Sequence, residues 1–268
     1  MNDLFSLKDK VAVVTGALGL LGKNHCRALS EAGANVVVVD IRENDCKKFA
    51  ETLSTKSIGV GCDITDVETV KKLKVTILKT FGKIDILVNN AAINDMFENP
   101  TAAAEQSKFE NYPLDLWQKS LDVNLTGTFL CSQVLGSEMA KAGKGSIINI
   151  ASTYGIVAPN QSIYKKENGE QSFYKSAAYP VTKGAIISFT RFLAAYWGDK
   201  GVRINTLSPG GVENNQEGYF LKNYSEATPL GRMAHPADYK GAIVFLASDA
   251  SSYMTGANLV VDGGWTAW

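Results

Sequence analysis

Six apolar runs, rich in β-branched residues, recur at intervals along the chain. They are VAVVT (11–15), NVVVVD (35–40), KIDILVN (83–89), GSIINI (145–150), VRINTL (202–207) and NLVVD (258–262). Runs this short and this uniformly apolar are typical of strands buried on both faces of a parallel sheet. Because such a sheet needs helices on both faces, this feature constrains the fold more than any other in the sequence.

Helical patterns fill the intervals between the runs. KNHCRALSEAGA (23–34) follows the first run and ends at Gly33, and DVETVKKLKVTILKTFGK (66–83) follows an N-cap at Thr65 or Asp66. Strands and helices that alternate in this way form right-handed βαβ units. The sequence therefore predicts an α/β fold, a Rossmann-type doubly wound parallel sheet with helices on both faces.

The composition is that of one large globular domain over residues 1–268. Hydrophobic residues make up 45% of the chain, enough for a substantial core. Because 27 basic and 27 acidic residues cancel, overall charge attracts neither nucleic acid nor an anionic membrane. Two long polar segments, 93–116 and 153–175, interrupt the alternation of strands and helices.

Neither the amino terminus nor the cysteines indicate secretion or a metal site. MNDLFSLKDK lacks the apolar core of a signal peptide, and no apolar run is long enough to span a membrane, so we expect a cytoplasmic protein. Cysteines 26, 46, 62 and 131 show no metal-ligand spacing with His25 or His235. We expect reduced, buried thiols and two histidines that are structural and hydrogen-bonded.

The first strand runs into a glycine-rich turn, VAVVTGALGLLGKN (11–24). Its G-x-x-G-x-x-G spacing, at Gly16, Gly19 and Gly22, differs from the dinucleotide fingerprint G-x-G-x-x-G. In a doubly wound sheet this turn is where a pyrophosphate meets the amino end of a helix. Taken alone, the three glycines fit a plain tight turn equally well.

Together with later motifs, the turn resembles the T-G-x-x-x-G-x-G turn of the short-chain dehydrogenase/reductase family. Thr15, Gly16 and Gly22 are in register, whereas Leu20 stands where that family has its middle glycine. Further similar stretches are GCDITD, LVNNAA, DVNLTG and SPGGV, and the resemblance extends from residue 8 to the end. It implies an NAD(P)-dependent enzyme whose cofactor contacts are Gly16, Leu18, Leu21, Gly22, Asp40, Ile41, Asp63, Ile64, Asn90, Ala91, Tyr179, Lys183, Pro209, Gly210 and Val212.

The cofactor preference depends on Asp40, which ends the second run. A carboxylate there accepts hydrogen bonds from the adenosine ribose hydroxyls and repels a 2′-phosphate, so NAD is favoured over NADP. Two alternatives stay open: Asp40 caps the next turn, or nearby Arg42 accommodates the phosphorylated cofactor.

Tyr179 and Lys183, in AAYPVTKGAI, are four residues apart on a predicted helix and so share one face. A neighbouring ammonium lowers the pKa of a tyrosine from its ordinary value near 10, which suits a proton-transfer group. The family resemblance adds Ser152, which holds the reacting oxygen, and Asn124, which belongs to a proton path through Lys183. The predicted catalytic set is Asn124, Ser152, Tyr179 and Lys183.

The segments 93–116 and 153–175 leave the carboxyl ends of strands, so both are expected to border the pocket. Their polar side chains suit a polyhydroxylated ligand, and 153–175 is expected to select substrate while contributing little to the core. GALGLLGK, YGIVAPN and SPGGVENNQ are similar to the flagellin-modification oxidoreductases of legionaminic-type sugar pathways. That resemblance implies a sugar, sugar phosphate or nucleotide sugar.

Two other functions and one assembly state also follow from the sequence. The rival functions are a carrier-protein-linked 3-oxoacyl reductase and a non-catalytic NAD-binding protein. The helix VTKGAIISFTRFLAAYW (181–197) is apolar around much of its circumference, and the tail holds Trp265 and Trp268, which are costly to expose. We therefore expect a homo-oligomer, a tetramer by family resemblance.

Overall fold

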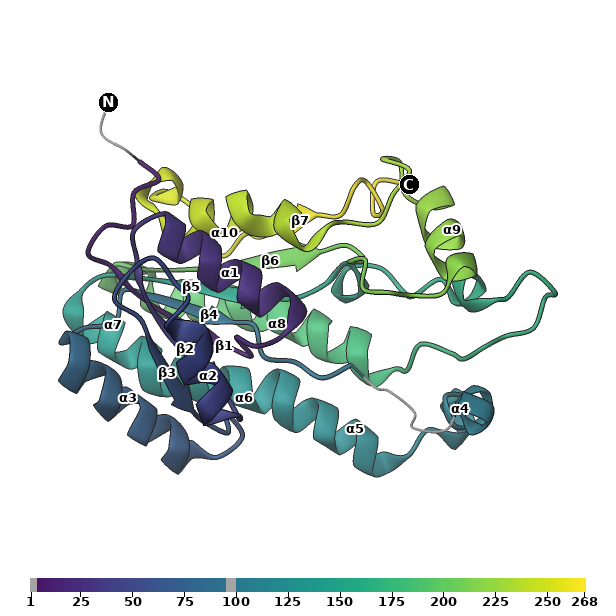
Figure 1. The fold of residues 1–268 in the computed structure, drawn as a ribbon, viewed down its shortest axis with the longest axis horizontal. Coiled ribbons are helices and arrows are strands. Elements are labelled where there is room, and N and C mark those ends of the chain that lie inside the picture. Colours follow the sequence, from purple (N-terminus) through teal and green to yellow (C-terminus); the bar gives the residue numbers. More distant parts are fainter. Residues whose placement is uncertain (1–3, 95–99) are drawn as a thin grey trace.

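Figure 1 shows one twisted parallel sheet with helices on both of its faces. The computed structural model describes residues 4–94 and 100–268, in which seven strands pair in the order β3-β2-β1-β4-β5-β6-β7. The strands are β1 (Val11–Thr15), β2 (Asn35–Asp40), β3 (Ile58–Gly61), β4 (Ile86–Asn89), β5 (Gly145–Ile150), β6 (Val202–Pro209) and β7 (Asn258–Val261). Every neighbouring pair is parallel, so the predicted fold class is confirmed.

The helices form two layers, one on each face of the sheet. In Figure 1, α1 and α10 lie above the sheet and α3, α5 and α6 lie below it. The helices are α1 (Leu20–Glu31), α2 (Glu43–Ala50), α3 (Val67–Phe81), α4 (Pro100–Gln106), α5 (Leu114–Leu121), α6 (Gly127–Cys131), α7 (Ser137–Ala142), α8 (Ala178–Trp197), α9 (Gly218–Glu226) and α10 (Lys240–Ala247).

The inner strands β1, β2, β4, β5 and β6 contribute side chains to two separate cores, one on each face of the sheet. In β1, Ala12 and Val14 pack in the core beneath α1, α2 and α10, whereas Val11 and Val13 pack in the core with α3 and α8. This is the period-two alternation of a strand, here apolar on both sides. It explains why the runs in the sequence are continuously hydrophobic.

The sequence analysis missed β3, whose residues are IGVG. A side chain at Gly59 would place its Cβ 2.1 Å from the Cys46 carbonyl carbon, so α2 lies directly against this strand. Only glycine permits that approach, and glycine removes the β-branched signal by which the other strands were found.

Both predicted helices form, with ends set by local chemistry. The α1 helix starts at Leu20, three residues before the predicted stretch, and Gly33 follows it with a φ of +103°. The predicted N-cap of α3 is Asp66, whose carboxylate accepts a hydrogen bond from the Glu68 N–H at 2.9 Å. Gly82 ends α3 in the left-handed conformation, with φ +74°.

Part of the segment 153–175 is core, which corrects its interpretation as a polar loop. Ile163 and Tyr164 are buried in a third cluster with Tyr224, Met233 and Trp265. The Tyr224 and Trp265 rings stack with centroids 4.2 Å apart. Trp265 is therefore covered within the chain and needs no partner subunit.

His25, in α1, is completely buried, and neither of its ring nitrogens has a hydrogen-bond partner among the described residues. This corrects the expectation of a satisfied histidine. Burial lowers the pKa of His25 from 6.5 to about 4, because a charged imidazole loses its hydration there. His235 does behave as expected: its Nδ1 accepts a hydrogen bond from the Ala237 N–H at 3.2 Å.

We predict that His25 makes the fold sensitive to acid. The unfolded state binds a proton at this site below pH 6.5, whereas the folded state resists protonation until about pH 4. Stability is therefore fully present above pH 6.5 and lost as the pH falls toward 4. The loss is roughly 2 to 3 kcal/mol of the free energy of unfolding.

Urea unfolding of the wild type and of His25→Met, at pH 7 and at pH 4.5, measures this loss. Carboxylates titrate in both proteins, so the difference between the two pH dependences isolates His25. Parallel pH dependences would show that His25 does not cause the loss.

Candidate active site

A cavity of about 420 Å³ opens at the carboxyl edge of the sheet, where ligands bind in folds of this class. Residues that follow β4, β5 and β6 meet there with the start of α8. The predicted site residues that line it are Leu21, Asn90, Ser152, Tyr179, Lys183, Pro209, Gly210 and Val212.

The glycine turn is shaped by two close approaches. Gly16 has φ +59°, and a Cβ on it would lie 2.6 Å from the Ala91 Cα. A Cβ on Gly22 would lie 2.2 Å from the Gly16 carbonyl oxygen. Gly19 has an ordinary φ of −70°, and Leu20 opens α1 with 39% of its surface exposed, lining the cavity. The helix thus accepts leucine where the family has glycine.

Asn90 joins this turn to the end of β4. Its amide nitrogen donates to the carbonyl oxygens of Thr15 and Gly16, each at 3.0 Å. The Thr15 hydroxyl accepts from the backbone N–H groups of Asn90 and Ala91, at 3.1 and 3.2 Å. The first turn and the β4 loop are therefore held as one unit.

Asp40 lies beside the turn at the end of β2. Its carboxylate accepts hydrogen bonds from the Leu18 N–H at 3.2 Å and from the Ile41 N–H at 2.9 Å. Arg42 points its guanidinium to Asp45, 3.5 Å away. A close-packed glycine turn at the start of a helix, with a carboxylate at the end of the neighbouring strand, fits the binding of a dinucleotide.

The remaining predicted adenosine-side residues follow β2 and β3. Asp63 accepts from the backbone N–H and the hydroxyl of Thr65, at 2.9 and 2.7 Å, so its side chain orders the loop. Ile64 is buried against Gly127, and Ile41 is exposed. These residues lie outside the cavity that holds Tyr179.

Ser152, Tyr179 and Lys183 come together around the cavity. Tyr179 and Lys183 lie one turn apart on α8, with the Lys183 ammonium 5.7 Å from the Tyr179 ring centroid. Ser152 follows β5, and its hydroxyl hydrogen bonds the Tyr179 oxygen. The Lys183 ammonium donates to the Ile150 carbonyl oxygen at 2.8 Å, which fixes it beneath the tyrosine.

Burial dominates the acid–base properties of this cluster. It raises the pKa of Tyr179, and the hydrogen bond from Ser152 acts in the opposite direction. Burial also lowers the pKa of Lys183 to about 8, with a further contribution from the charge of Lys175. Burial therefore outweighs the lowering of the Tyr179 pKa that was expected from the neighbouring Lys183 ammonium, which corrects that expectation.

Asn124 lies behind the cavity and does not line it. It sits in a π-helical turn, Asp122–Thr126, between α5 and α6, a distortion often found at functional sites. Its side chain accepts from the Ile93 N–H at 2.8 Å and donates to the Thr182 hydroxyl at 3.2 Å. Asn124 thus connects the loop after β4 with the residue that precedes Lys183.

The two polar segments differ in their relation to the cavity. Thr153, Tyr154 and Tyr164, from the segment 153–175, line it. Among the described residues of 93–116, only Asn94 does so, and Glu105 and residues 107–112 border a neighbouring hollow instead. Residues 95–99 lie outside the described part of the chain.

The sequence analysis did not single out Lys175, which also lines the cavity. Its ammonium lies 4.2 Å from the centroid of the Tyr179 ring. The available signal was its position four residues before Tyr179, the same spacing that separates Tyr179 from Lys183 on the other side.

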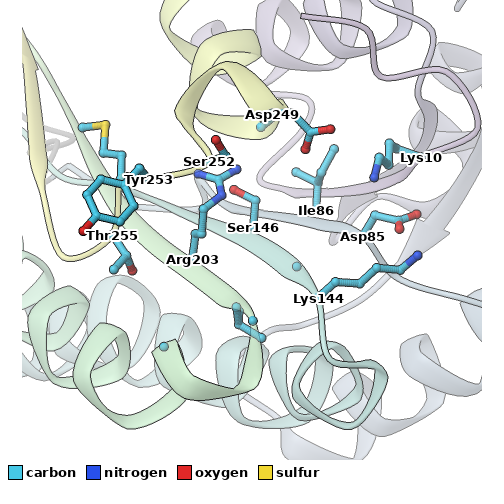
Figure 2. A pocket seen from close by; sticks show the side chains of 16 residues that line it. Lys10, Asp85, Ile86, Lys144, Ser146, Arg203, Asp249, Ser252, Tyr253 and Thr255 are labelled. Carbon is cyan, nitrogen blue, oxygen red and sulfur yellow. The ribbon is translucent and has the colours of Figure 1, made fainter. Parts of the chain in front are cut away.

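A second hollow, of about 560 Å³, lies at the opposite, amino edge of the sheet (Figure 2). Arg203, Ser146 and Asp85 project toward it, and none of the predicted site residues lines it. The Arg203 guanidinium is held by the Ser251 hydroxyl and the carbonyl oxygens of Leu246 and Ser248. The Arg203 guanidinium at this hollow therefore has a structural role and does not indicate a catalytic site.

The fold and the cavity define a Rossmann-type, NAD(P)-dependent oxidoreductase. A family model described as enoyl-(acyl carrier protein) reductase matches residues 16–266. The chain belongs to the short-chain dehydrogenase/reductase family and acts on CH–OH groups.

Three curated relatives cover almost the whole chain. This chain is 34% identical to an NAD-dependent glycerol dehydrogenase of Listeria innocua, with 98% of this chain and 96% of the relative covered. It is 35% identical to a D-threitol dehydrogenase of Mycolicibacterium smegmatis, with 98% and 95% covered. It is also 35% identical to a 2-dehydro-3-deoxy-D-gluconate 5-dehydrogenase of Pseudoalteromonas atlantica, with 99% of each covered.

Solved structures agree with this assignment. A short-chain type dehydrogenase/reductase of Mycobacterium marinum superposes with a TM-score of 0.85 at 30% identity, covering 98% of each chain. A gluconate 5-dehydrogenase of Burkholderia cenocepacia, in complex with NADP and tartrate, gives 0.84 at 30% identity, covering 99% of this chain and 98% of that one. Members of this group therefore use NAD or NADP. In the described part of this chain, no helix has the length and apolarity to cross a bilayer.

We predict that Tyr179→Phe retains NAD(H) affinity and loses turnover by roughly 10²- to 10⁴-fold, because it removes only the proton-transferring oxygen. Lys183→Met should lower both the NAD(H) affinity and the turnover, because Lys183 lines the same cavity. Calorimetric titration with NAD(H) and steady-state kinetics separate the two effects.

Tyr154→Phe is the matched control, since Tyr154 lines the same cavity and its hydroxyl pairs with that of Tyr164. It should keep most of the turnover. Near-normal kcat in Tyr179→Phe would overturn the assignment of Tyr179.

Proposed function

We propose that this enzyme transfers a hydride between NAD and a secondary alcohol or ketone of a sugar, sugar phosphate or nucleotide sugar. The observation that carries the proposal is the cluster of Ser152, Tyr179 and Lys183, which opens into a cavity with polar and aromatic walls. Asn94, Asn214 and Gln216 supply amides, and Tyr154 supplies a hydroxyl. Such groups suit a ligand with several hydroxyls, since each buried hydroxyl needs a partner.

The protein's own residues handle the proton. The nicotinamide cofactor, when bound, accepts or returns the hydride. In the oxidation, the Tyr179 oxygen takes the proton of the substrate hydroxyl, and in the reduction it returns that proton to the carbonyl oxygen. Ser152 holds the reacting oxygen beside Tyr179, and the Lys183 ammonium favours the phenolate. Asn124 positions this set through Thr182.

The preference for NAD rests on Asp40. Its carboxylate is held at the end of β2 by the backbone N–H groups of Leu18 and Ile41, so it cannot readily turn away from a ribose. A 2′-phosphate would meet this negative charge. Arg42, which the alternative assigns to the phosphate, is exposed and lies 3.5 Å from the Asp45 carboxylate.

The narrower resemblance to flagellin-modification oxidoreductases stays a hypothesis about the pathway. The relatives named above are dehydrogenases of glycerol, threitol and a keto-deoxygluconate, which supports a polyhydroxylated substrate in general. Asp40 argues against the rival 3-oxoacyl reductase, because reductive biosynthesis normally draws on NADPH. We also assign the enzyme to the cytoplasm, because all four cysteines are free and buried.

The proposed assembly is a homotetramer. Phe192 and Tyr196 on α8 stack with ring centroids 5.9 Å apart while 61% and 58% of their surfaces are exposed. Phe129 on α6 and Phe189 on α8 lie beside them around a shallow hollow of about 770 Å³. An aromatic face of this kind is typical of a protein–protein interface.

The function predicts a clear substrate and cofactor pattern. The substrates to test are sugars, sugar phosphates, nucleotide sugars and alditols. We expect a higher kcat/KM for their oxidation with NAD⁺ than with NADP⁺, measured from the absorbance of the NADH or NADPH formed. Asp40→Ala should narrow the difference between the two cofactors, because it removes the charge that repels the 2′-phosphate.

Tyr179→Phe supplies the background rate in every assay. Equal or greater activity with NADP⁺ would overturn the cofactor assignment. Oxidation confined to aliphatic or acyl substrates would overturn the substrate class.

For assembly, we expect light scattering at micromolar protein to give the mass of four chains. Phe192→Asp should lower that mass, because it places a charge in the aromatic face. Phe109→Asp is the matched control, since Phe109 is also exposed but lies outside this face. A monomeric wild type, or equal effects of both substitutions, would contradict the proposed interface.

A further inference from the structure

Tyr224, on α9, is a buried part of the cavity wall. It lines the same cavity as Ser152 and Tyr179, and only 4% of its surface is exposed. The Trp265 ring stacks on the Tyr224 ring, with centroids 4.2 Å apart and planes within 13° of parallel. The Tyr224 ring is thus held in place between the C-terminal tail and the cavity.

The Tyr224 hydroxyl binds the turn that follows β6. Its oxygen accepts a hydrogen bond from the Gly211 N–H at 2.5 Å, and the Gly211 carbonyl oxygen accepts one from the Ala234 N–H at 2.9 Å. A Cβ on Gly211 would lie 2.4 Å from the Tyr224 Cζ, so this close approach requires glycine. The phenol is therefore fixed beside Gly210 and Val212, two of the predicted cofactor contacts.

Tyr224 still has a hydrogen to donate. Its oxygen accepts the Gly211 N–H, and no acceptor for the Tyr224 O–H is found among the described residues. Tyr154 and Tyr164, in the same wall, differ because their hydroxyls pair with each other at 3.4 Å. Burial raises the pKa of Tyr224 and outweighs the opposing hydrogen bond from Gly211, so the phenol keeps its proton at neutral pH. A buried donor is costly when unpaired, and a ligand oxygen in the cavity gives it a partner.

We infer that Tyr224 determines specificity by donating a hydrogen bond to a second oxygen of the substrate, distinct from the reacting one. Ser152 and Tyr179 act on the reacting oxygen from the end of β5 and from α8, whereas Tyr224 reaches the cavity from α9. A substrate without the second oxygen leaves the Tyr224 donor unpaired, which lowers its binding and its rate of oxidation. The inference rests on the proposed function and supplies the residue that selects a polyhydroxylated substrate over a simple secondary alcohol.

A different role for Tyr224 would be to brace the Gly211 turn and nothing more. Tyr239 offers the comparison, because its hydroxyl donates to the Gly210 carbonyl oxygen of the same turn at 3.4 Å. Tyr239 is completely buried and is not among the residues that line the cavity. A brace acts alike on every substrate that the enzyme oxidises. A donor to the substrate acts only on compounds that carry the oxygen it binds.

The experiment uses the compound that the wild type oxidises best with NAD⁺ among alditols, sugars, sugar phosphates and nucleotide sugars, together with its monodeoxy analogues. One analogue should lose about 10- to 100-fold in kcat/KM, because it leaves the Tyr224 donor unpaired. Tyr224→Phe, which keeps the ring, should lower kcat/KM for the parent compound by a similar factor. The same substitution should lower kcat/KM far less for that one analogue, and as much as for the parent for the analogues that lack a different hydroxyl.

Tyr239→Phe is the matched control, since it removes a hydroxyl that contacts the same turn from outside the cavity. It should change kcat/KM for the parent and for every analogue by one common factor. A wild type that discriminates against none of the analogues, or a Tyr224→Phe variant that also shows one common factor, would overturn the inference and leave the proposed function standing. Oxidation of none of the compounds, with NAD(H) binding intact, would reject the proposed function and this inference with it.

Discussion

The hydrogen bonds between Thr15 and Asn90 join the two halves of the sheet where its strand order reverses. From β1, the chain proceeds outward through β2 to β3, and then returns beside β1 as β4. At that boundary the Asn90 amide holds the carbonyl oxygens of Thr15 and Gly16, and Ala91 approaches Gly16 so closely that a Cβ there would clash. The crevice that binds dinucleotides in this fold class is shaped by that contact.

The α8 helix carries residues of the candidate active site, of the core and of the exposed surface. Its inward face buries Lys183 and Thr182, one bound to the end of β5 and the other to Asn124. Two turns farther on, the same helix exposes Phe192. Burying an ammonium group costs free energy unless it is paired, and the Ile150 carbonyl provides a partner that is fixed by the sheet. The position of Lys183 thus depends on the register of β5 against β6.

The sequence predicted the features that depend on residue periodicity and on local motifs. It missed the features that depend on close packing between elements far apart in the chain. The six strands, the turn at Gly16 and the pairing of Tyr179 with Lys183 follow from local patterns. The strand β3 was missed because the contact between Gly59 and α2 replaces β-branched residues with glycine. The unsatisfied His25 and the buried Trp265 were missed because neither is encoded in nearby residues: each results from elements that pack against it from far along the chain.

The segment 153–175 combines a cavity wall with a packed core of its own. Ile163 and Tyr164 anchor it in a small aromatic core with Tyr224 and Trp265, which is separate from the two cores on the faces of the sheet. Residues between these anchors and Tyr179 can therefore change without disturbing the sheet, while Gln161 keeps the backbone of Lys175 in place. The Tyr164 hydroxyl also contacts that of Tyr154 in the cavity wall. Because Tyr164 and Tyr224 belong both to this small core and to the cavity wall, we expect a substitution in the core to change the shape of the cavity.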